Sequence, residues 1–311
     1  MTERFLVSVD LEALDSPQEG LDLKTISYLN RVHIAVTPKT VDAASLFLQR
    51  HFNYCITYVD VTALDNLPDI IALLNNGATR VFVAFHQIKA IVEDRLLSDL
   101  NRLIVSLDHS ACEGDPVTRT LEIKADLKNV VGDADVAVQV HDVHDWKLLD
   151  TMYRFSGLNG FPARYVSLAY NTWDNYLRAQ KYGHIPIVPA SALTIEPKKY
   201  PHLIPAELLI TTSISSDRPD RLYPTVVVNE HGLTLGLVYS NEASVEAALR
   251  LGKGVYKSRK RDGVWIKGET SGDSQDLISI DWDCDGDALR FTVRQKGDGR
   301  RALYQHRIYP H

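Results

Sequence analysis

Apolar runs and amphipathic stretches alternate along the N-terminal part of the chain. The apolar runs are short, rich in β-branched residues and typical of buried strands; they cover residues 55–61, 80–85, 102–107, 165–169 and 185–188. The stretches between them carry apolar residues at helical spacing and cover residues 69–74, 88–100 and 173–182. Alternation of strand and helix favours parallel βα units. We therefore predict an α/β domain, either a partial barrel or a doubly wound sheet, and slightly favour the partial barrel.

Prolines and lysines concentrate in residues 196–205, as is typical of a linker. This stretch divides the chain into two predicted domains, residues 1–200 and residues 201–311. A chain of 311 residues with 45% hydrophobic content can supply two domains with cores of their own.

The second domain carries the pattern of a compact, mostly β, α+β fold. Apolar runs at residues 225–228 and 233–239 flank an Asn-Glu-His-Gly turn, which predicts a hairpin. A helix is predicted over residues 242–251, begun near Ser240 or Asn241 and ended by Gly252. Alternating residues before and after the segment 283–287 predict two further strands.

Composition and charge exclude several classes of protein. No apolar run is long enough for a membrane span, and Asp10, Glu12 and Asp15 interrupt any signal-peptide pattern, so a cytoplasmic protein is expected. A net charge of -6 argues against general nucleic-acid binding. The chain has 3 cysteines, too few and too unevenly spaced for a disulfide scaffold.

The densest cluster of chemically reactive residues reads Asp283-Cys284-Asp285-Gly286-Asp287. Three carboxylates this close repel one another unless a cation lies among them. At the period of a strand, the aspartates project to one side and Cys284 to the other. Oxygen ligands suit Mg²⁺ and a thiolate suits Zn²⁺, so this segment predicts a metal site. The alternative is an acidic, solvated turn, since turns favour Asp and Gly.

A second motif precedes the acidic one at a fixed spacing. It comprises Tyr256, the basic run Ser258-Arg259-Lys260-Arg261, and Trp265-Ile266-Lys267-Gly268-Glu269-Thr270-Ser271-Gly272. With the acidic segment, this pattern resembles the phosphoribosyl-AMP cyclohydrolase family of histidine biosynthesis, as found in the first part of the fungal trifunctional histidine protein. The segments 217–223 and 236–241 resemble the start of that family's domain. The resemblance runs from about residue 217 to residue 295.

The resemblance implies hydrolytic opening of the adenine ring of phosphoribosyl-AMP between N1 and C6, by a homodimer. It implies Zn²⁺ with Cys284 as a ligand, to lower the pKa of the attacking water, and Mg²⁺ at Asp283, Asp285 and Asp287. Glu269 is the candidate for proton transfer. The implied contacts to the phosphoribosyl nucleotide are Arg259, Arg261, Trp265, Lys267, Gly268, Thr270, Ser271 and Gly272.

Each of these residues also has a structural interpretation. The basic run followed by Asp262-Gly263 suits the solvated end of a hairpin. Trp265 suits a hydrophobic core as well as a stacking role. Gly268 and Gly272 suit positions that need a positive φ angle.

The chain departs from the family pattern after the acidic segment. The family has a Cys-His pair and a further Cys there, which complete the zinc site across the dimer, whereas this chain has no cysteine after Cys284. His306 and His311 are candidate substitutes. We interpret the last ten or so residues as a truncation or a shifted reading frame. The competing hypothesis is a non-catalytic remnant that binds phosphoribosyl nucleotide or serves as an assembly module.

The N-terminal domain has no functional motif of comparable strength. His141-Asp142-Val143-His144-Asp145 has the H-x-x-H spacing of some metal sites, but no third ligand follows at motif spacing, and we expect a surface or loop role. His109 and Cys112 are similarly weak indications.

Overall fold

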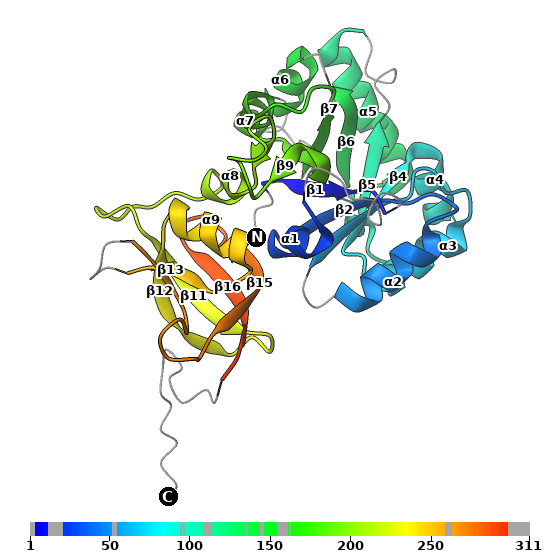
Figure 1. The fold of residues 1–311 in the computed structure, drawn as a ribbon. Helices are drawn as coiled ribbons and strands as arrows, with labels where there is room; N and C mark the ends of the chain where they lie inside the picture. The colour runs from blue at the N-terminus through cyan, green and yellow to red at the C-terminus, as the bar shows by residue number, and fades with distance from the viewer. Residues whose placement is uncertain are drawn as a thin grey trace, which may run out of the picture. The chain divides into compact units, whose positions relative to one another are not determined.

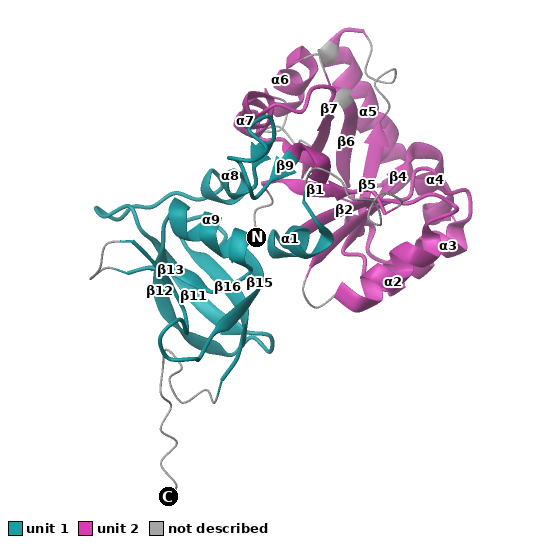
Figure 2. Cartoon of the chain, viewed as in Figure 1, with its two compact units in different colours: residues 1–2, 19–30, 193–311 teal, residues 3–18, 31–192 magenta. Residues whose placement is uncertain are grey.

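The computed structural model describes residues 4–11, 21–51, 55–93, 95, 97–107, 114–134, 136–143, 146–154, 161, 163–258 and 263–297. The chain forms two compact units (Figure 2). The first comprises residues 3–18 and 31–192 and is called the barrel unit. The second comprises residues 1–2, 19–30 and 193–311 and is called the C-terminal unit.

The barrel unit is a closed barrel of eight parallel strands (Figure 1). In chain order the strands are β1 (Leu6–Val9), β2 (Arg31–Ala35), β3 (Ile56–Asp60), β4 (Arg80–Ala84), β5 (Leu103–Leu107), β6 (Ala137–Val143), β7 (Arg164–Leu168) and β8 (Ile185–Pro189). Val7 of β1 pairs with Val32 on one side and with Val188 on the other, which closes the ring. The predicted α/β class is confirmed, and the barrel is complete where the sequence indicated a partial one.

Helices connect the barrel strands. They are α2 (Val41–His51), α3 (Leu67–Asn75), α4 (Phe85–Glu93), α5 (Pro116–Val131), α6 (Trp146–Arg154) and α7 (Trp173–Lys181). The helix predicted over residues 88–100 begins and ends earlier than expected. A separate 3-10 turn, Leu100–Arg102, follows it, because the Asp99 side chain accepts a hydrogen bond from the Asn101 N–H and caps a new start.

The C-terminal unit is built on a four-stranded sheet in the order β12-β11-β16-β15. Its strands are β11 (Tyr223–Asn229), β12 (Thr234–Ser240), β15 (Gln275–Trp282) and β16 (Leu289–Gln295), with a separate hairpin of β13 (Val255–Lys257) and β14 (Val264–Ile266). All pairs in the sheet are antiparallel except β11 with β16. The mostly β class predicted for this part of the chain is confirmed.

The predicted hairpin and helix of this unit form as expected from local signals. The Asn229 side chain accepts hydrogen bonds from the backbone N–H groups of His231 and Leu233 and so shapes the turn between β11 and β12. Helix α9 (Glu242–Leu251) begins with a capping box between Asn241 and Ser244. It ends at Gly252, whose φ of 60° lies in the left-handed region.

The stretch that was predicted as a linker, residues 196–205, follows one short strand and ends in another. β9 (Leu193–Thr194) pairs in parallel with β10 (Ile204–Pro205), and helix α8 (Glu207–Thr211) follows directly. The two strands belong to the C-terminal unit, so the segment between them folds back on itself within that unit.

Helix α1 (Leu23–Tyr28) belongs to the C-terminal unit, although it lies between β1 and β2 in the sequence. It contacts β15 and α9, and its Ile26 and Tyr28 side chains are buried. Asn30, which follows it, donates a buried hydrogen bond to the Asp281 carboxylate at 3.1 Å. Asp281 lies on β15 and is also paired with Arg290 at 2.9 Å. Periodicity gave no reason to place this helix with residues so distant in sequence.

Replacing Asn30 with glycine should therefore destabilise the C-terminal unit. Asn30 has a φ of 57°, which glycine tolerates, so the substitution removes the hydrogen bond without straining the backbone. We expect the free energy of unfolding to fall by about 2 kcal/mol, because the bond is buried and its acceptor is charged. Urea denaturation, with hydrogen exchange of the β15 amides, measures the effect. Ser27→Ala, which removes only an exposed hydroxyl contact on α1, is the control; an equal effect from it would contradict the role of Asn30.

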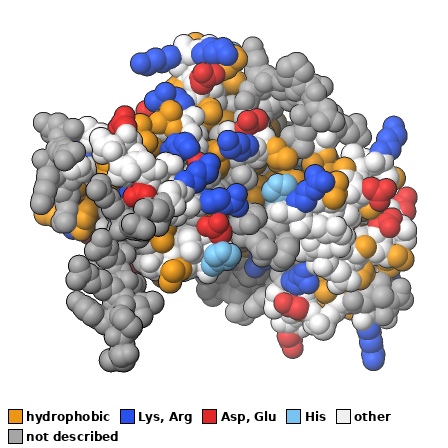
Figure 3. All heavy atoms as spheres, turned by 60° about the horizontal axis from the view of Figure 1, so that its bottom comes forward, with side chains coloured by type: hydrophobic (Ala, Val, Ile, Leu, Met, Phe, Trp, Pro, Cys, Tyr) orange, Lys and Arg blue, Asp and Glu red, His pale blue; other side chains and the backbone are white. Residues whose placement is uncertain are grey.

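The surface of the molecule carries mixed charge. In the face shown in Figure 3, basic and acidic side chains lie near one another, and hydrophobic side chains are scattered between them. Within the described ranges, no helix combines the length and the apolar character that crossing a membrane requires.

Candidate functional site

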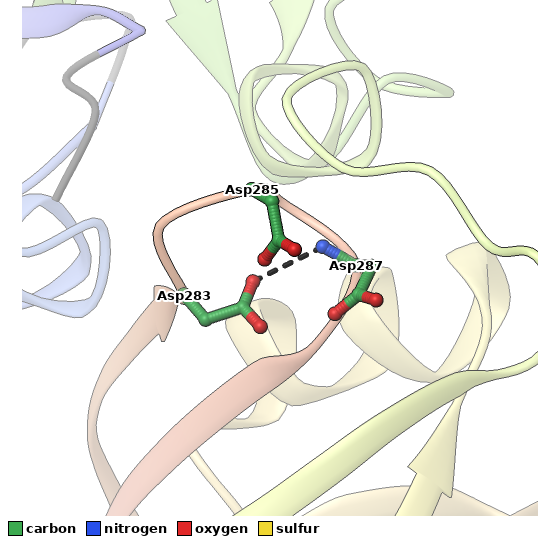
Figure 4. Close-up of side chains that lie close together, drawn as sticks. All are labelled: Asp283, Asp285 and Asp287. Atoms are coloured by element: carbon green, nitrogen blue, oxygen red, sulfur yellow. Dashed lines mark hydrogen bonds between the residues drawn. The ribbon is translucent and has the colours of Figure 1, made fainter.

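The acidic segment forms the loop between β15 and β16. The carboxylates of Asp283, Asp285 and Asp287 offer oxygen atoms that all lie within 4.8 Å of one another, and the side chains converge (Figure 4). The predicted convergence therefore occurs. It arises from a tight turn instead of strand alternation, since Gly286 has a φ of 78°.

The three aspartates differ in how much their side chains contribute to the hydrogen bonds of the loop. Asp283 Oδ1 accepts hydrogen bonds from the backbone N–H groups of Gly286, Asp287 and Ala288 at 3.0, 3.0 and 3.2 Å. The carbonyl of Gly286 accepts a further bond from the Ser215 N–H at 2.7 Å. Asp283 thus stabilises the turn as an Asx-type residue, which accounts for one carboxylate without a metal. No such backbone hydrogen bond involves the exposed Asp285 and Asp287 side chains among the described residues.

The hydrogen bonds and charges of the loop shift the pKa values of Asp283 and Asp287 in opposite directions. Partial desolvation opposes ionisation of Asp283, but hydrogen bonds from Ala288, Asp287 and Gly286 together hold its pKa below the usual range. The pKa of Asp287 is raised, first by its hydrogen bond with the Asp283 carboxyl and then by the charges of Asp285, Asp283 and Asp217. The loop therefore concentrates negative charge that a cation would neutralise.

The donor set fits a hard divalent cation better than zinc. Three carboxylates within reach of one another are typical ligands of Mg²⁺. Cys284 is exposed, and its Sγ lies 3.9 Å from Asp285 Oδ1. A catalytic zinc ion takes three protein ligands, and in the described part of the chain no cluster of potential metal ligands joins Cys284 to two others. His306 and His311 lie outside the described residues.

The last part of the second motif, from Lys267 to Gly272, lies in the turn between β14 and β15. Within it the Gly272 N–H bonds the Gly268 carbonyl at 2.9 Å. Gly268 and Gly272 both have positive φ angles, 89° and 80°, in agreement with their structural interpretation. Glu269 and Thr270 are exposed, and Ser271 is half-buried with its Oγ near the Asp273 N–H. The turn thus presents small polar groups to solvent.

The aromatic and basic residues of this motif differ in how deeply they are buried. Trp265 is half-buried against Tyr256, with ring centres 6.0 Å apart, so it serves in packing. Lys267 is almost fully buried, and its Nζ lies 6.0 Å from the centre of the Trp265 ring. Arg259 and Arg261 lie outside the described residues.

The two motifs lie at opposite ends of one strand. The turn at residues 267–274 leads into β15, and the acidic loop follows its last residue, Trp282. Eight extended residues span about 23 Å, so the two motifs of one chain are too far apart to contact the same purine ring.

The sequence did not predict the two glutamines, Gln275 and Gln295, that connect Tyr256 to the start of β15 and the end of β16. The Tyr256 hydroxyl donates to Gln275 Oε1 at 2.7 Å, and the Gln275 amide donates to Gln295 Oε1 at 3.0 Å. Burial raises the pKa of Tyr256, so its hydroxyl remains a hydrogen-bond donor. Tyr256 was noted as part of the motif, but nothing in the spacing indicated its glutamine partners.

The geometry defines a two-part chain: a parallel α/β barrel joined to a small, mostly β domain that carries a loop with three convergent carboxylates. The profile of the family described as phosphoribosyl-AMP cyclohydrolase matches residues 236–302, which include both motifs. The phosphoribosyl-AMP cyclohydrolase of Granulibacter bethesdensis is 43% identical over 86 residues, which are 26% of this chain and 67% of that protein. The chain belongs to the phosphoribosyl-AMP cyclohydrolase family.

The similarity to fungal proteins extends over the barrel as well. The histidine biosynthesis trifunctional protein of Neurospora crassa is 37% identical over 301 residues, which are 94% of this chain and 32% of that protein. The protein of the same name from Candida albicans is 26% identical over 294 residues, which are 92% of this chain and 31% of that protein. The chain thus spans about a third of the length of these relatives.

Proposed function

We propose that the C-terminal unit hydrolyses the adenine ring of 1-(5-phosphoribosyl)-AMP between N1 and C6, in the cytoplasm and as a step of histidine biosynthesis. The observation that carries this proposal is the convergence of three carboxylates in the loop that follows β15, of which the fold itself uses only Asp283. Family membership supplies the substrate.

The proposal gives each predicted site residue a role. Mg²⁺ held by Asp283, Asp285 and Asp287 would neutralise the phosphate groups of the substrate. The turn from Gly268 to Gly272 binds a phosphate or the purine edge through the hydroxyls of Thr270 and Ser271. Arg259, Arg261 and Lys267 complement the phosphate charge of the substrate. Glu269 is exposed on the turn and handles the proton of the attacking water.

Cys284 is the one residue that we propose as a zinc ligand. A zinc ion bound to that thiolate would supply an activated water once two further ligands complete the site. Because the described residues do not provide those ligands around Cys284, we assign no step to zinc.

We further propose that each site is shared between two copies of the chain. The turn with Glu269 and the loop with Asp285 are separated by the length of β15 in one copy, so a substrate that contacts both needs the turn of one copy beside the loop of its partner. A twofold dimer produces two such sites by symmetry.

Mixing two inactive variants tests the proposal. Ring opening is measured by absorbance with Mg²⁺ and Zn²⁺ supplied. The wild-type chain should be active, whereas Glu269→Gln and Asp285→Ala should each be nearly inactive. After subunit exchange, the mixture should regain about a quarter of wild-type activity, because half of the dimers hold one intact site of two.

Two results would contradict these proposals. No restoration in a mixture that demonstrably exchanges subunits would place both motifs in one-chain sites and overturn the shared site. An inactive wild-type chain, with both metals supplied, would overturn the proposed hydrolysis and favour a remnant that only binds the nucleotide.

A further inference from the structure

Hydrogen-bonded side chains connect three segments of the C-terminal unit beneath the second motif. The Tyr256 hydroxyl donates to Gln275 Oε1 at 2.7 Å, and the Gln275 amide donates to Gln295 Oε1 at 3.0 Å. The Gln295 amide donates to the backbone carbonyls of Ser274 and Lys296 at 3.1 and 2.9 Å. Tyr256 and Gln275 are both 0% exposed. We call Tyr256, Gln275 and Gln295 the tyrosine-glutamine network.

The direction of each hydrogen bond in this network is fixed by its ends. Carbonyl groups only accept, so Gln295 must turn its NH₂ group toward the two backbone carbonyls and its Oε1 toward Gln275. Gln275 must then donate its amide to Gln295 and present its own Oε1 to Tyr256. Burial raises the pKa of Tyr256, so its hydroxyl keeps the proton that this bond needs. Only one arrangement of the three side chains therefore satisfies every buried polar atom.

Gly254 leaves the space that the network occupies. A Cβ atom at this position would lie 2.6 Å from Gln275 Oε1 and 2.8 Å from the Tyr256 hydroxyl oxygen. The backbone of Gly254 donates to the Gln275 carbonyl and accepts from the Lys267 N–H, both at 2.9 Å. Lys267 is the first residue of the turn between β14 and β15, so the network is tied to the start of that turn.

The other end of the network holds the end of the same turn. The Ser274 carbonyl accepts from the Gln295 amide at 3.1 Å and from the Lys296 N–H at 2.8 Å. Gly268 packs closely on this segment, since an added Cβ would lie 2.4 Å from the backbone N and Cα of Ser274. The turn is thus fixed at its start through Gly254 and at its end through Gln295.

The polar character of the network has a purpose other than stability. Apolar side chains of the same shape can replace a buried hydrogen-bonded pair at little cost in stability. A fully satisfied polar network adds a single, rigid arrangement of the segments that it joins. Here it joins β13, which leads into the basic run at residues 258–261, to the turn on which Glu269 and Thr270 are exposed.

We propose that Gln275 is a positioning residue for the ring-opening reaction: through the tyrosine-glutamine network it holds Glu269 and the hydroxyls of the turn in place relative to the basic run. Gln275 is fully buried, so it acts without touching the substrate. This role rests on the proposed function of the C-terminal unit.

Gln275→Glu in the full 311-residue chain tests this role. The substitution keeps the shape of the side chain but places a carboxylate oxygen against Gln295 Oε1, where the amide donated. We expect kcat to fall about a hundredfold, because a displacement of about 1 Å at a reacting group costs that much. Hydrogen exchange of the Glu269 and Thr270 amides, measured without substrate, should become faster.

The pH dependence separates positioning from a general loss of stability. A protonated carboxyl group can donate to Gln295 as the amide does, whereas a carboxylate cannot. The kcat of Gln275→Glu relative to wild type at the same pH should therefore rise as the pH is lowered. A ratio that stays constant over the pH range would contradict the proposed donor role of Gln275.

Two further variants make the test independent of how well Gln275→Glu folds. Tyr256→Phe removes only the hydroxyl at the end of the network and should lower kcat about tenfold, the effect of one hydrogen bond. Ser244→Ala is the matched control, because it removes a buried hydroxyl from the capping box of α9 in the same unit. It should leave kcat and the exchange of the turn amides at wild-type values.

The outcomes distinguish this role from the proposed hydrolysis. If the wild-type chain is active, wild-type kcat and turn exchange in Tyr256→Phe, or an equal fall in kcat from Ser244→Ala, would overturn the positioning role alone. An inactive wild-type chain would overturn the proposed hydrolysis and any role of Gln275 in it. The exchange rates of the turn amides would still show whether the network fixes the turn.

Discussion

Replacing Asp285 with alanine should reduce Mg²⁺-dependent ring opening about a hundredfold or more, because the loss of residues that merely orient metal ligands already costs about 10- to 100-fold. The side chain is exposed and takes no part in the backbone hydrogen bonds of its loop, which Asp283 accepts. The variant should therefore fold like wild type and lose only its affinity for Mg²⁺ and substrate. Steady-state kinetics and calorimetric titration with Mg²⁺ measure both effects.

A matched carboxylate elsewhere in the same unit provides the control. Glu230 is paired with Arg294 at 3.2 Å on the surface, and Glu230→Gln should leave turnover and Mg²⁺ dependence unchanged. Equal activity of wild type and Asp285→Ala across the Mg²⁺ titration would show that the loop is a solvated acidic turn.

The raised pKa of Asp287 adds a pH dependence to the same experiment. Protons compete with Mg²⁺ for this carboxylate, so affinity for the ion should fall as the pH decreases through the raised pKa. Since the Asp285 charge is one cause of that raised pKa, Asp285→Ala should move the pH dependence to lower pH. Mg²⁺ titrations at several pH values would reveal the shift.

Replacing Gly268 with alanine should destabilise the C-terminal unit by about 3 kcal/mol, because strain and overpacking act together. Its φ of 89° is unfavourable for any residue with a Cβ atom. An added Cβ would also lie 2.4 Å from the backbone N and Cα of Ser274, which cannot move without displacing the start of β15. Urea denaturation and hydrogen exchange of the β15 amides measure the loss.

Gly272 in the same motif separates strain from steric conflict. Its φ is 80°, but an added Cβ would meet no atom within 4 Å. Gly272→Ala should cost only about 1 kcal/mol, the backbone contribution alone. Equal losses for the two variants would mean that contact with Ser274 does not restrict this turn.

Local signals determined much of the C-terminal unit. The hairpin of β11 and β12 follows from alternation around an Asn-initiated turn, and α9 follows from its capping box and terminal glycine. The acidic loop was recognisable because its residues are adjacent in sequence. The different roles of its three carboxylates were not recognisable. The turn that Gly286 permits decides which carboxylate accepts the backbone hydrogen bonds.

The barrel shows where such signals fail. β2 and β6 escaped the sequence analysis because their inward positions include His33, Gln139 and His141, which interrupt the apolar pattern of a buried strand. The same polar residues lie in the barrel interior, where they contact other polar side chains. His141 lies in strand β6, so the expectation of a surface or loop position for this residue was wrong; His144 lies outside the described residues. A polar interior thus weakens the apolar periodicity that would reveal the strand.

The sequence by itself determined the class of both parts of the chain, the elements with strong caps and turns, and the family of the C-terminal part, because periodicity, capping and motif spacing are properties of neighbouring residues. Only the tertiary structure decided the closure of the barrel by β1 and β8, the packing of α1 and Asn30 onto β15, and the meeting of His33 with Asp60. Each of these joins residues on different elements, and the choice among such pairings depends on which packing buries the most apolar surface while leaving the fewest polar groups unsatisfied.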